Sequence, residues 1–337
     1  MPRSQWSVEE YVQGVCRGDR VALGKAITLI ESTRSDHQVL AQQLLERLAF
    51  LPTEATLRVA VTGAPGVGKS SFIEALGMYL VERGQRVAVL AIDPSSAVSG
   101  GSILGDKTRM ERLSASEQVF IRPSPAGDTL GGVARKTRET VRLVEAAGYH
   151  TVFIETVGVG QSEVAVRHIT DVFLLLLLPG AGDELQGIKR GIVEMADLLV
   201  VNKADGDRLP LAHKAQGYYR NAVQLLPPHP SGWVPRVLMC SSAEGSGIAE
   251  VWQAVQEAVQ QFHQSGYFDR QRRQQALYWL RQSVEDELRR RFYRNEAVQQ
   301  LLSTLEAEVA EGRLSPFAAA DRLLQAYDGR LSQGPPE

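Results

Sequence analysis

The sequence predicts an α/β fold in which a mostly parallel sheet is flanked by helices, with a helical extension at each end of the chain. Between about residues 57 and 265, short apolar runs alternate for the most part with stretches of helical spacing, which is typical of parallel strands joined by crossover helices. Before and after this region only helical periodicity is found. We therefore divide the chain into residues 1–55, 56–265 and 266–337. The runs predicted to be strands are 57–62, 87–92, 119–121, 152–154, 172–178, 198–201 and 237–239.

Composition and charge exclude several classes of protein. The chain has 337 residues, of which 44% are hydrophobic, and this is enough apolar material for a full core. A formal net charge of −2 gives no electrostatic basis for binding nucleic acid or a membrane surface, and we predict neither partner. The most apolar run, 172–178, is shorter than the about 20 residues of a membrane-spanning helix. Two cysteines cannot form a disulfide framework and the start of the chain lacks a secretory signal, so we expect a cytoplasmic protein.

The strongest local signal is the run 63–70, Gly-Ala-Pro-Gly-Val-Gly-Lys-Ser, which matches the phosphate-binding P-loop pattern at every fixed position. It follows a predicted strand and precedes a predicted helix, as the pattern requires. Backbone N–H groups would surround the phosphate oxygens, Lys69 would reach the β- and γ-phosphates, and the Ser70 hydroxyl would bind Mg²⁺. The sequence therefore predicts a P-loop nucleotide hydrolase. The residues predicted to bind phosphate are Gly63, Ala64, Pro65, Gly66, Val67, Gly68, Lys69, Ser70 and Ser71.

The run Asn-Lys-Ala-Asp at 202–205 predicts which base is bound. A carboxylate such as that of Asp205 can accept hydrogen bonds from N1–H and the 2-amino group of guanine, whereas adenine offers neither donor, so we expect GTP. The stem of Lys203 would cover one face of the base, and backbone N–H groups of 241–243 would contact the guanine oxygen. Such residues also form ordinary turns. The predicted base-binding residues are Asn202, Lys203, Asp205, Ser241, Ser242 and Ala243.

The predicted strand 152–154 leads to an acid that we assign to catalysis. Glu155 can hold the Mg²⁺ shell, and the N–H of Gly158 can meet the γ-phosphate. Val159 stands where a glutamine that orients the attacking water is often found. We therefore predict slow intrinsic hydrolysis that needs help from a partner or another segment.

Three further segments carry candidate residues. Asp93 ends a predicted strand, and Asp106 lies in a glycine-containing segment, 100–110, that is typical of a switch ordering around Mg²⁺ and the γ-phosphate. A helix cap or a surface turn is the alternative for each acid. In 179–190, Lys189 or Arg190 would place positive charge near the phosphates, or would form an ordinary solvated pair. The predicted metal ligands are Ser70, Asp93, Asp106 and Glu155.

Together these segments resemble the MeaB/ArgK family of G proteins, the bacterial relatives of the methylmalonic aciduria type A protein. The resemblance rests on 63–71, 93–96, 100–110, 155–163, 183–190 and 202–205. It implies a GTPase chaperone of an adenosylcobalamin-dependent acyl-CoA mutase, chiefly methylmalonyl-CoA mutase, that gates cofactor loading and helps to remove damaged cofactor. It also implies a homodimer, a Mg²⁺ shell formed with Asp93, Asp106 and Glu155, and a third switch in which Lys189 activates hydrolysis when the mutase binds. Nothing in the sequence indicates a cobalamin site, and we predict none.

Two other functions remain open, namely a GTPase that delivers nickel or another metal and a small-molecule kinase. The six histidines are scattered, unlike the ligand clusters of metal carriers. A kinase would prefer ATP, against the presence of Asp205, and would need a second substrate pocket. In the C-terminal region, one helical stripe is predicted to contribute to the dimer contact. It consists of Leu277, Leu280, Val284, Leu288 and Phe292.

Overall fold

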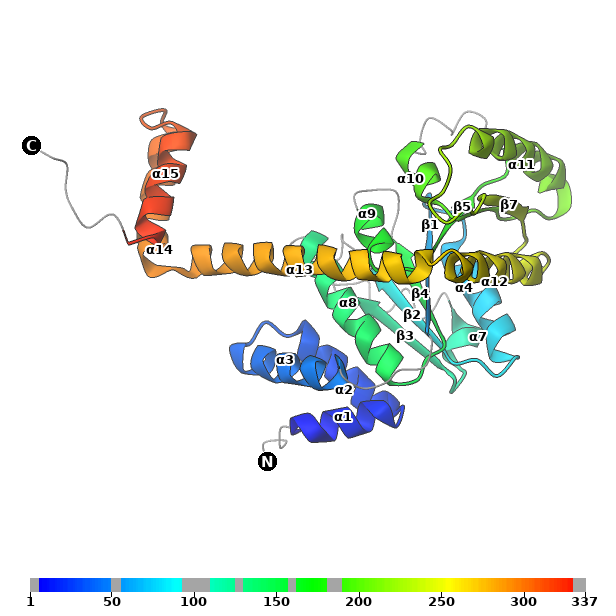
Figure 1. The fold of residues 1–337 in the computed structure, drawn as a ribbon, viewed down its shortest axis with the longest axis horizontal. Coiled ribbons are helices and arrows are strands. Elements are labelled where there is room, and N and C mark those ends of the chain that lie inside the picture. Colours follow the sequence, from blue (N-terminus) through cyan, green and yellow to red (C-terminus); the bar gives the residue numbers. More distant parts are fainter. Residues whose placement is uncertain are drawn as a thin grey trace, which may run out of the picture. The chain divides into compact units, whose positions relative to one another are not determined.

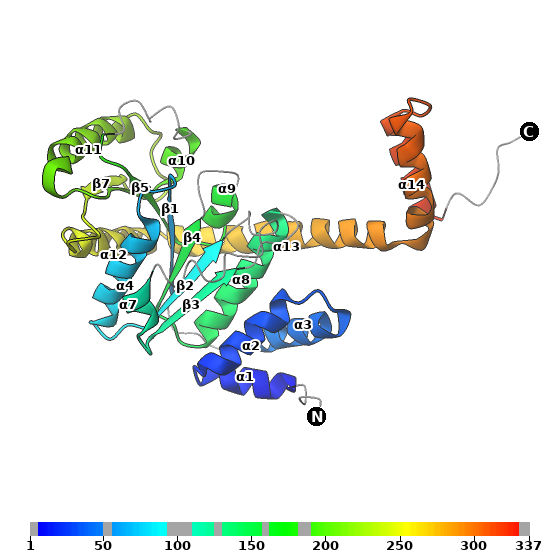
Figure 2. The same ribbon diagram turned by 180° about the vertical axis from the view of Figure 1, so that it is seen from behind.

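The sheet is the centre of the structure, and its topology confirms the predicted fold. The computed structural model describes residues 6–49, 56–92, 110–124, 130–156, 162–180 and 190–329. Within these ranges, seven strands form one sheet in the order β3-β2-β4-β1-β5-β6-β7, and every neighbouring pair is parallel (Figures 1 and 2). The strands are β1 Leu57–Gly63, β2 Val87–Ile92, β3 Val119–Ser124, β4 Thr151–Thr156, β5 Val172–Leu177, β6 Leu198–Val201 and β7 Arg236–Met239.

The most apolar runs form the most buried strands of the sheet. Strands β4, β5 and β6 are buried along their whole length, as expected of parallel strands covered on both faces. Strand β1 lies between β4 and β5, so its carboxyl end is flanked by the ends of two other central strands. Ligands of open parallel sheets bind outside such strand ends, which positions the phosphate-binding loop that follows β1.

Helices of the first unit cover the sheet in two groups. Helix α4 packs against α7 and α12, whereas α8 packs against α9 and against the N-terminal helices (Figure 1). The helices are α1 Val8–Cys16, α2 Arg20–Glu31, α3 Ser35–Ala49, α4 Lys69–Val81, α7 Glu111–Ser114, α8 Leu130–Ala146, α9 Ser162–Arg167, α10 Arg190–Met195, α11 Leu209–Gln224 and α12 Ile248–Gln264.

Charged side chains of β3 and α8 hold the ends of the N-terminal helices α2 and α3. Arg122 of β3 forms an ion pair with Glu31, and the Nζ of Lys136 donates to the Glu31 backbone oxygen at 2.8 Å. Arg142 of α8 donates to the Leu48 oxygen of α3 at 2.7 Å. These contacts hold the predicted N-terminal extension against α8 and the edge strand β3.

The chain divides into two compact units, Met1–Ala276 and Leu277–Glu337, with the boundary inside helix α13 Tyr267–Arg294. Within the first unit, Arg272 forms an ion pair with the buried Asp171 at 2.7 Å. In the second unit, α14 Glu296–Ala310 packs against α15 Pro316–Tyr327. The sequence-based division at 55 and 265 stays a prediction.

No helix in the described ranges combines the length and the hydropathy needed to cross a membrane. Both cysteines are free thiols, with Cys16 exposed and Cys240 buried.

Candidate nucleotide-binding site

The loop between β1 and α4 has a backbone that two glycines make possible. Gly63 has a φ of 148°, and a Cβ on it would lie 2.6 Å from the backbone oxygen of Leu176. Gly68 has a φ of 93°, and a Cβ there would lie 2.9 Å from the Asn202 Nδ2 atom. Other residues rarely adopt such conformations, and the neighbouring atoms leave no room for a side chain. The loop is therefore built for a tight turn into the N-terminus of α4, where anions bind favourably.

Lys69 is the first residue of α4, and its side chain folds back over the loop. Its Nζ donates to the backbone oxygens of Gly63 at 2.8 Å and Ala64 at 3.2 Å. Burial lowers the pKa of Lys69, while the carboxylates of Glu155 and Glu163 act in the opposite direction. An ammonium group thus lies at the loop, with carbonyl contacts that a phosphate can replace.

Ser70 and Glu155 are brought together by the pairing of β1 with β4. Val61 lies beside Glu155 in the strand register, and the Ser70 hydroxyl donates to Glu155 Oε1 at 2.9 Å. Glu155 is buried, with 6% of its surface exposed. A hydroxyl and a carboxylate are hard oxygen ligands of the kind that Mg²⁺ prefers, so this pair fits the ion. The structure thus places together two of the four predicted metal ligands.

The other predicted catalytic and metal residues lie outside the described residues. These are Asp93, Asp106, Gly158 and Lys189. Within the ranges that the structure describes, no group of three or more His, Cys, Asp or Glu side chains is placed to hold a metal ion.

Asn202 joins the phosphate-binding loop to the loop after β7. It follows β6 and is 1% exposed. Its Nδ2 donates to the Val67 backbone oxygen at 2.9 Å, and its Oδ1 accepts from the Ser242 N–H at 3.2 Å and hydroxyl at 2.8 Å. Three segments that are far apart in the sequence therefore meet at one buried amide.

Lys203 also contacts the phosphate-binding loop. Its Nζ donates to the Gly66 backbone oxygen at 2.7 Å. Its φ is 58°, and no other non-glycine residue in the described ranges has a positive φ. Such a conformation costs about 1–3 kcal/mol and is common at ligand-binding sites. The strained backbone places the lysine stem alongside the loop.

Asp205 is held by two donors, one from the loop after β7 and one three residues further along the chain. Its carboxylate accepts from the hydroxyl of Ser241 and forms an ion pair with Arg208. The Ser241 hydrogen bond and, next, the Arg208 contact lower the pKa of Asp205, so the side chain is an acceptor at neutral pH. Arg208 was not among the predicted site residues, although it is a basic residue three positions after the acid.

The three backbone N–H groups of the loop 241–243 differ in their hydrogen-bond partners. The Ser241 N–H donates to the Ser246 oxygen at 2.9 Å, and the Ser242 N–H donates to Asn202. The Ala243 N–H makes no hydrogen bond among the described residues. Of the three predicted donors to guanine, Ala243 is therefore the one that internal contacts leave available.

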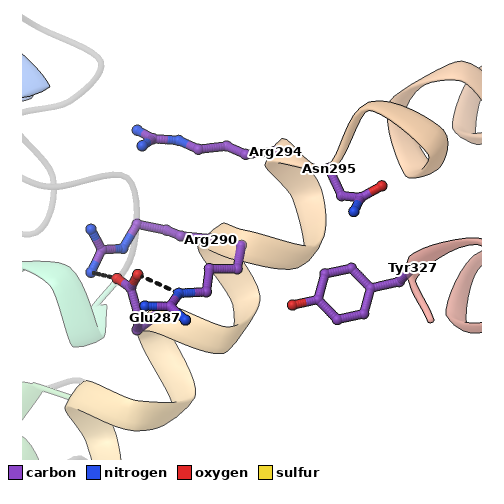
Figure 3. Close-up of a pocket in the computed structure, with 6 residues that line it drawn as sticks. Glu287, Arg290, Arg294, Asn295 and Tyr327 are labelled. Atoms are coloured by element: carbon purple, nitrogen blue, oxygen red, sulfur yellow. Dashed lines mark hydrogen bonds and ion pairs between the residues drawn. The ribbon is translucent and has the colours of Figure 1, made fainter. Parts of the chain in front are cut away.

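A cavity in the second unit is separate from these residues. It has a volume of about 360 Å³ and lies at the end of α13. Glu287 forms ion pairs with Arg290 at 2.7 Å and with Arg291 at 2.9 Å. Figure 3 shows the hydroxyl of Tyr327 pointing towards Glu287. None of the predicted site residues lines it.

Comparison with known proteins gives long matches along the chain. Residues 23–297 match the family model described as methylmalonyl Co-A mutase-associated GTPase MeaB. A probable GTPase of Mycobacterium tuberculosis is 52% identical over 320 residues, which cover 95% of this chain and 95% of that protein. A mouse protein, the mitochondrial methylmalonic aciduria type A homolog, is 44% identical over 337 residues, which cover 97% of this chain and 81% of that protein.

A solved structure is similar over almost the whole chain. It is described as a LAO/AO transport system kinase and is 37% identical in sequence, with a TM-score of 0.74. The match covers 96% of this chain and 99% of that one.

Proposed function

Because the chain belongs to the MeaB family of methylmalonyl-CoA mutase-associated GTPases, we propose that it is a cytoplasmic GTP-hydrolysing chaperone of an adenosylcobalamin-dependent acyl-CoA mutase, with methylmalonyl-CoA mutase as the first candidate. It would gate cofactor loading and protect or reactivate that enzyme, without binding cobalamin itself. The observation that carries the nucleotide part is the bridge made by Asn202, which links the phosphate-binding loop to the predicted base-binding loop. The family assignment does not favour the alternatives of a metal-delivering GTPase or a small-molecule kinase.

In the proposed complex, GTP lies across the carboxyl ends of β1, β6 and β7. Lys69 moves from the backbone oxygens of Gly63 and Ala64 to the β- and γ-phosphates. Asp205 accepts from N1–H and the 2-amino group of guanine, and the Ala243 N–H donates to the guanine oxygen. The stem of Lys203, already fixed on the loop, covers one face of the base.

The proposed Mg²⁺ site is formed around the contact between Ser70 and Glu155. Ser70 would bind the ion, and Glu155 would hold its shell, together with Asp93 and Asp106. When Mg²⁺ is bound, it would neutralise part of the negative charge of the phosphates. The role of this chain's residues is to hold oxygen ligands within reach of the β- and γ-phosphates.

Asp205→Asn should lower the affinity for GTP by about ten- to a hundredfold, because an amide nitrogen would face the guanine donors and one charged acceptor would be lost. Xanthosine triphosphate carries a carbonyl oxygen where guanine has the 2-amino group, so it should bind the Asp205→Asn variant better than GTP does. Calorimetry with GTP, ATP and xanthosine triphosphate measures all three affinities.

The matched control for that experiment is Asp207→Asn, which makes the same change at an exposed position two residues away. It should leave the order of the three affinities as in the parent protein. Equal affinity of the parent for ATP and GTP would contradict the guanine site.

The chaperone part is tested by adding the partner. Single-turnover GTP hydrolysis should be faster with saturating methylmalonyl-CoA mutase than without it, since Val159 stands where a water-orienting glutamine is often found. An unrelated acyl-CoA enzyme that uses no cobalamin serves as the control protein. An unchanged rate, together with no binding of the mutase in the presence of a non-hydrolysable GTP analogue, would reject the proposed partner.

We also propose that the C-terminal helices contribute to a homodimer. Along α13, Leu277, Leu280, Val284 and Leu288 are 49–61% exposed and recur at steps of three and four residues. Such a stripe is one face of a helix, and an apolar face of this kind is buried when two helices pair. Because each side chain is already about half buried, its complete burial would stabilise a dimer by about 0.7–1.8 kcal/mol.

Changing Leu280 and Leu288 together to Glu should convert the dimer to a monomer at micromolar concentration, because charges would replace apolar contacts. Sedimentation velocity measures the change, and GTP affinity should stay that of the parent. The control is Leu225→Glu, which alters a leucine of the first unit that is 84% exposed. A monomeric parent protein would rule out the dimer.

A further inference from the structure

A cavity of about 460 Å³ lies among the N-terminal helices, in the first unit. One face of α2, from Arg20 to Leu29, forms its main wall. Tyr11 of α1, His37 of α3 and Arg122 of β3 complete it. No residue of the candidate nucleotide site lines this cavity. Its volume is within the range of about 300–1,000 Å³ that is usual for small-molecule sites.

The floor of the cavity is kept open by a glycine that the fold does not require. Gly24 lies in the interior of α2, where glycine costs about 1 kcal/mol relative to alanine. A Cβ added to Gly24 would meet no atom within 4 Å. By contrast, a Cβ on Gly14 of α1 would lie 2.5 Å from the Ala22 Cβ, so that glycine is needed for helix packing. At Gly24 a side chain would extend into the cavity instead.

The wall carries more positive than negative charge. Arg20, Lys25 and Arg122 all line the cavity, and Glu31 pairs with Arg122. Among the described residues no carboxylate pairs with Arg20 or Lys25, and the Lys25 ammonium lies 3.8 Å from the centre of the Trp6 ring. Arg20 and Lys25 therefore keep positive charge that no described carboxylate neutralises, with Lys25 held over the Trp6 ring, and both can attract an anion.

The remaining lining groups are the hydroxyls of Tyr11 and Thr28, the imidazole of His37 and apolar surface. The Thr28 hydroxyl already donates to the Gly24 backbone oxygen at 2.9 Å. Tyr11 is 8% exposed, and its hydroxyl makes no hydrogen bond within the described residues. Burial raises the pKa of Tyr11, so the hydroxyl stays protonated and can donate. Val21 and Leu29 add apolar wall on either side of Gly24. The lining thus combines cations, a Tyr11 hydroxyl that no internal contact uses, and apolar surface.

We propose that this cavity binds a small organic anion, with a phosphate or carboxylate group held by Arg20, Lys25 and the Tyr11 hydroxyl and an apolar body lying over Gly24. A charged head and an apolar body match the two kinds of surface that the cavity presents. This site is distinct from the nucleotide site, since the two share no residue.

The test is calorimetry of the full-length protein with excess GDP and Mg²⁺, using phenyl phosphate, benzoate and benzyl alcohol as probes. Phenyl phosphate or benzoate should bind one site per chain, and the tighter of the two identifies the head group. Benzyl alcohol has the same ring without the charge and should bind at least about tenfold more weakly, as expected when a charged hydrogen bond is lost. Equal binding of the alcohol, or no binding of either anion, overturns the proposal.

Two variants locate the binding in the cavity. Gly24→Leu should reduce the affinity for the preferred anion at least about tenfold by filling the floor. Its control is Gly217→Leu, since Gly217 lies in α11 and a Cβ there also meets nothing within 4 Å. Arg20→Gln, with exposed Arg17→Gln as its control, should weaken binding without altering the cavity floor. Parent-like affinity in both Gly24→Leu and Arg20→Gln would place the anion elsewhere, including at the phosphate-binding loop.

Discussion

Lys69→Ala is expected to lower the single-turnover rate of GTP hydrolysis by about 10²–10³-fold, the usual loss when one preorganised donor to the transition state is removed. In the structure its ammonium group is already within the phosphate-binding loop, bonded to the oxygens of Gly63 and Ala64. We therefore expect it to move only a short way to reach the phosphates. In this variant the negative charge that develops on the β- and γ-phosphates would lose the cation that Lys69 provides.

The rate must be measured at GTP concentrations that saturate each variant, with the affinity determined separately by calorimetry. Lys214→Ala is the matched control, because it removes an exposed lysine of α11 and should hydrolyse GTP at the parent rate. Lys69→Arg keeps the charge but presents a planar fork to a cradle of two carbonyl oxygens, so it should remain slow. Parent-like hydrolysis by Lys69→Ala at saturation would show that this loop does not act on GTP.

Lys189→Ala is expected to remove most of the stimulation by the mutase, on the order of 10³-fold if this lysine acts as a cation on the transition state. The residue lies outside the described residues, so this prediction rests on the sequence segment 179–190 and on the proposed partner. In the sequence, Val159 stands where a water-orienting glutamine is often found, and we expect a cation supplied on mutase binding to compensate.

The measurement is single-turnover hydrolysis with and without saturating mutase, expressed as the ratio of the two rates. That ratio should fall towards one in Lys189→Ala and stay at the parent value in Lys214→Ala. Binding of the mutase to both variants is checked by sedimentation, so that loss of stimulation is separated from loss of the complex. If Lys189→Ala is stimulated as strongly as the parent, Lys189 is an ordinary surface residue.

The strands and the phosphate-binding loop could be predicted from the sequence because their signals are local. A run such as 172–178 is apolar at every position, and this pattern suits only a strand covered on both faces or a fully buried helix. The loop 63–70 holds its glycines, lysine and serine within eight positions, so its backbone and its helix N-terminus follow from a contiguous segment.

The candidate site was only partly predictable, since some of its contacts join distant segments. The sequence named Ser70 and Glu155, but their 2.9 Å contact depends on β1 pairing with β4. The ion pair between Asp205 and Arg208 was missed, because a basic residue in a short turn has many possible partners. The cavity above Gly24 was not predicted either, since a helix glycine does not reveal whether its Cβ would meet an atom.

The sequence by itself therefore determined the α/β class, the phosphate-binding loop and the identity of the acid expected to contact guanine. Only the tertiary structure decided which amide of 241–243 is left available, because Asn202 must first be buried between two loops to take up the Ser242 N–H. The tertiary structure also decided that one face of α2 lines a cavity with positively charged side chains. Local patterns specify backbone conformation within one turn or strand, whereas strand order and the burial of single polar groups are set by packing across the whole sheet.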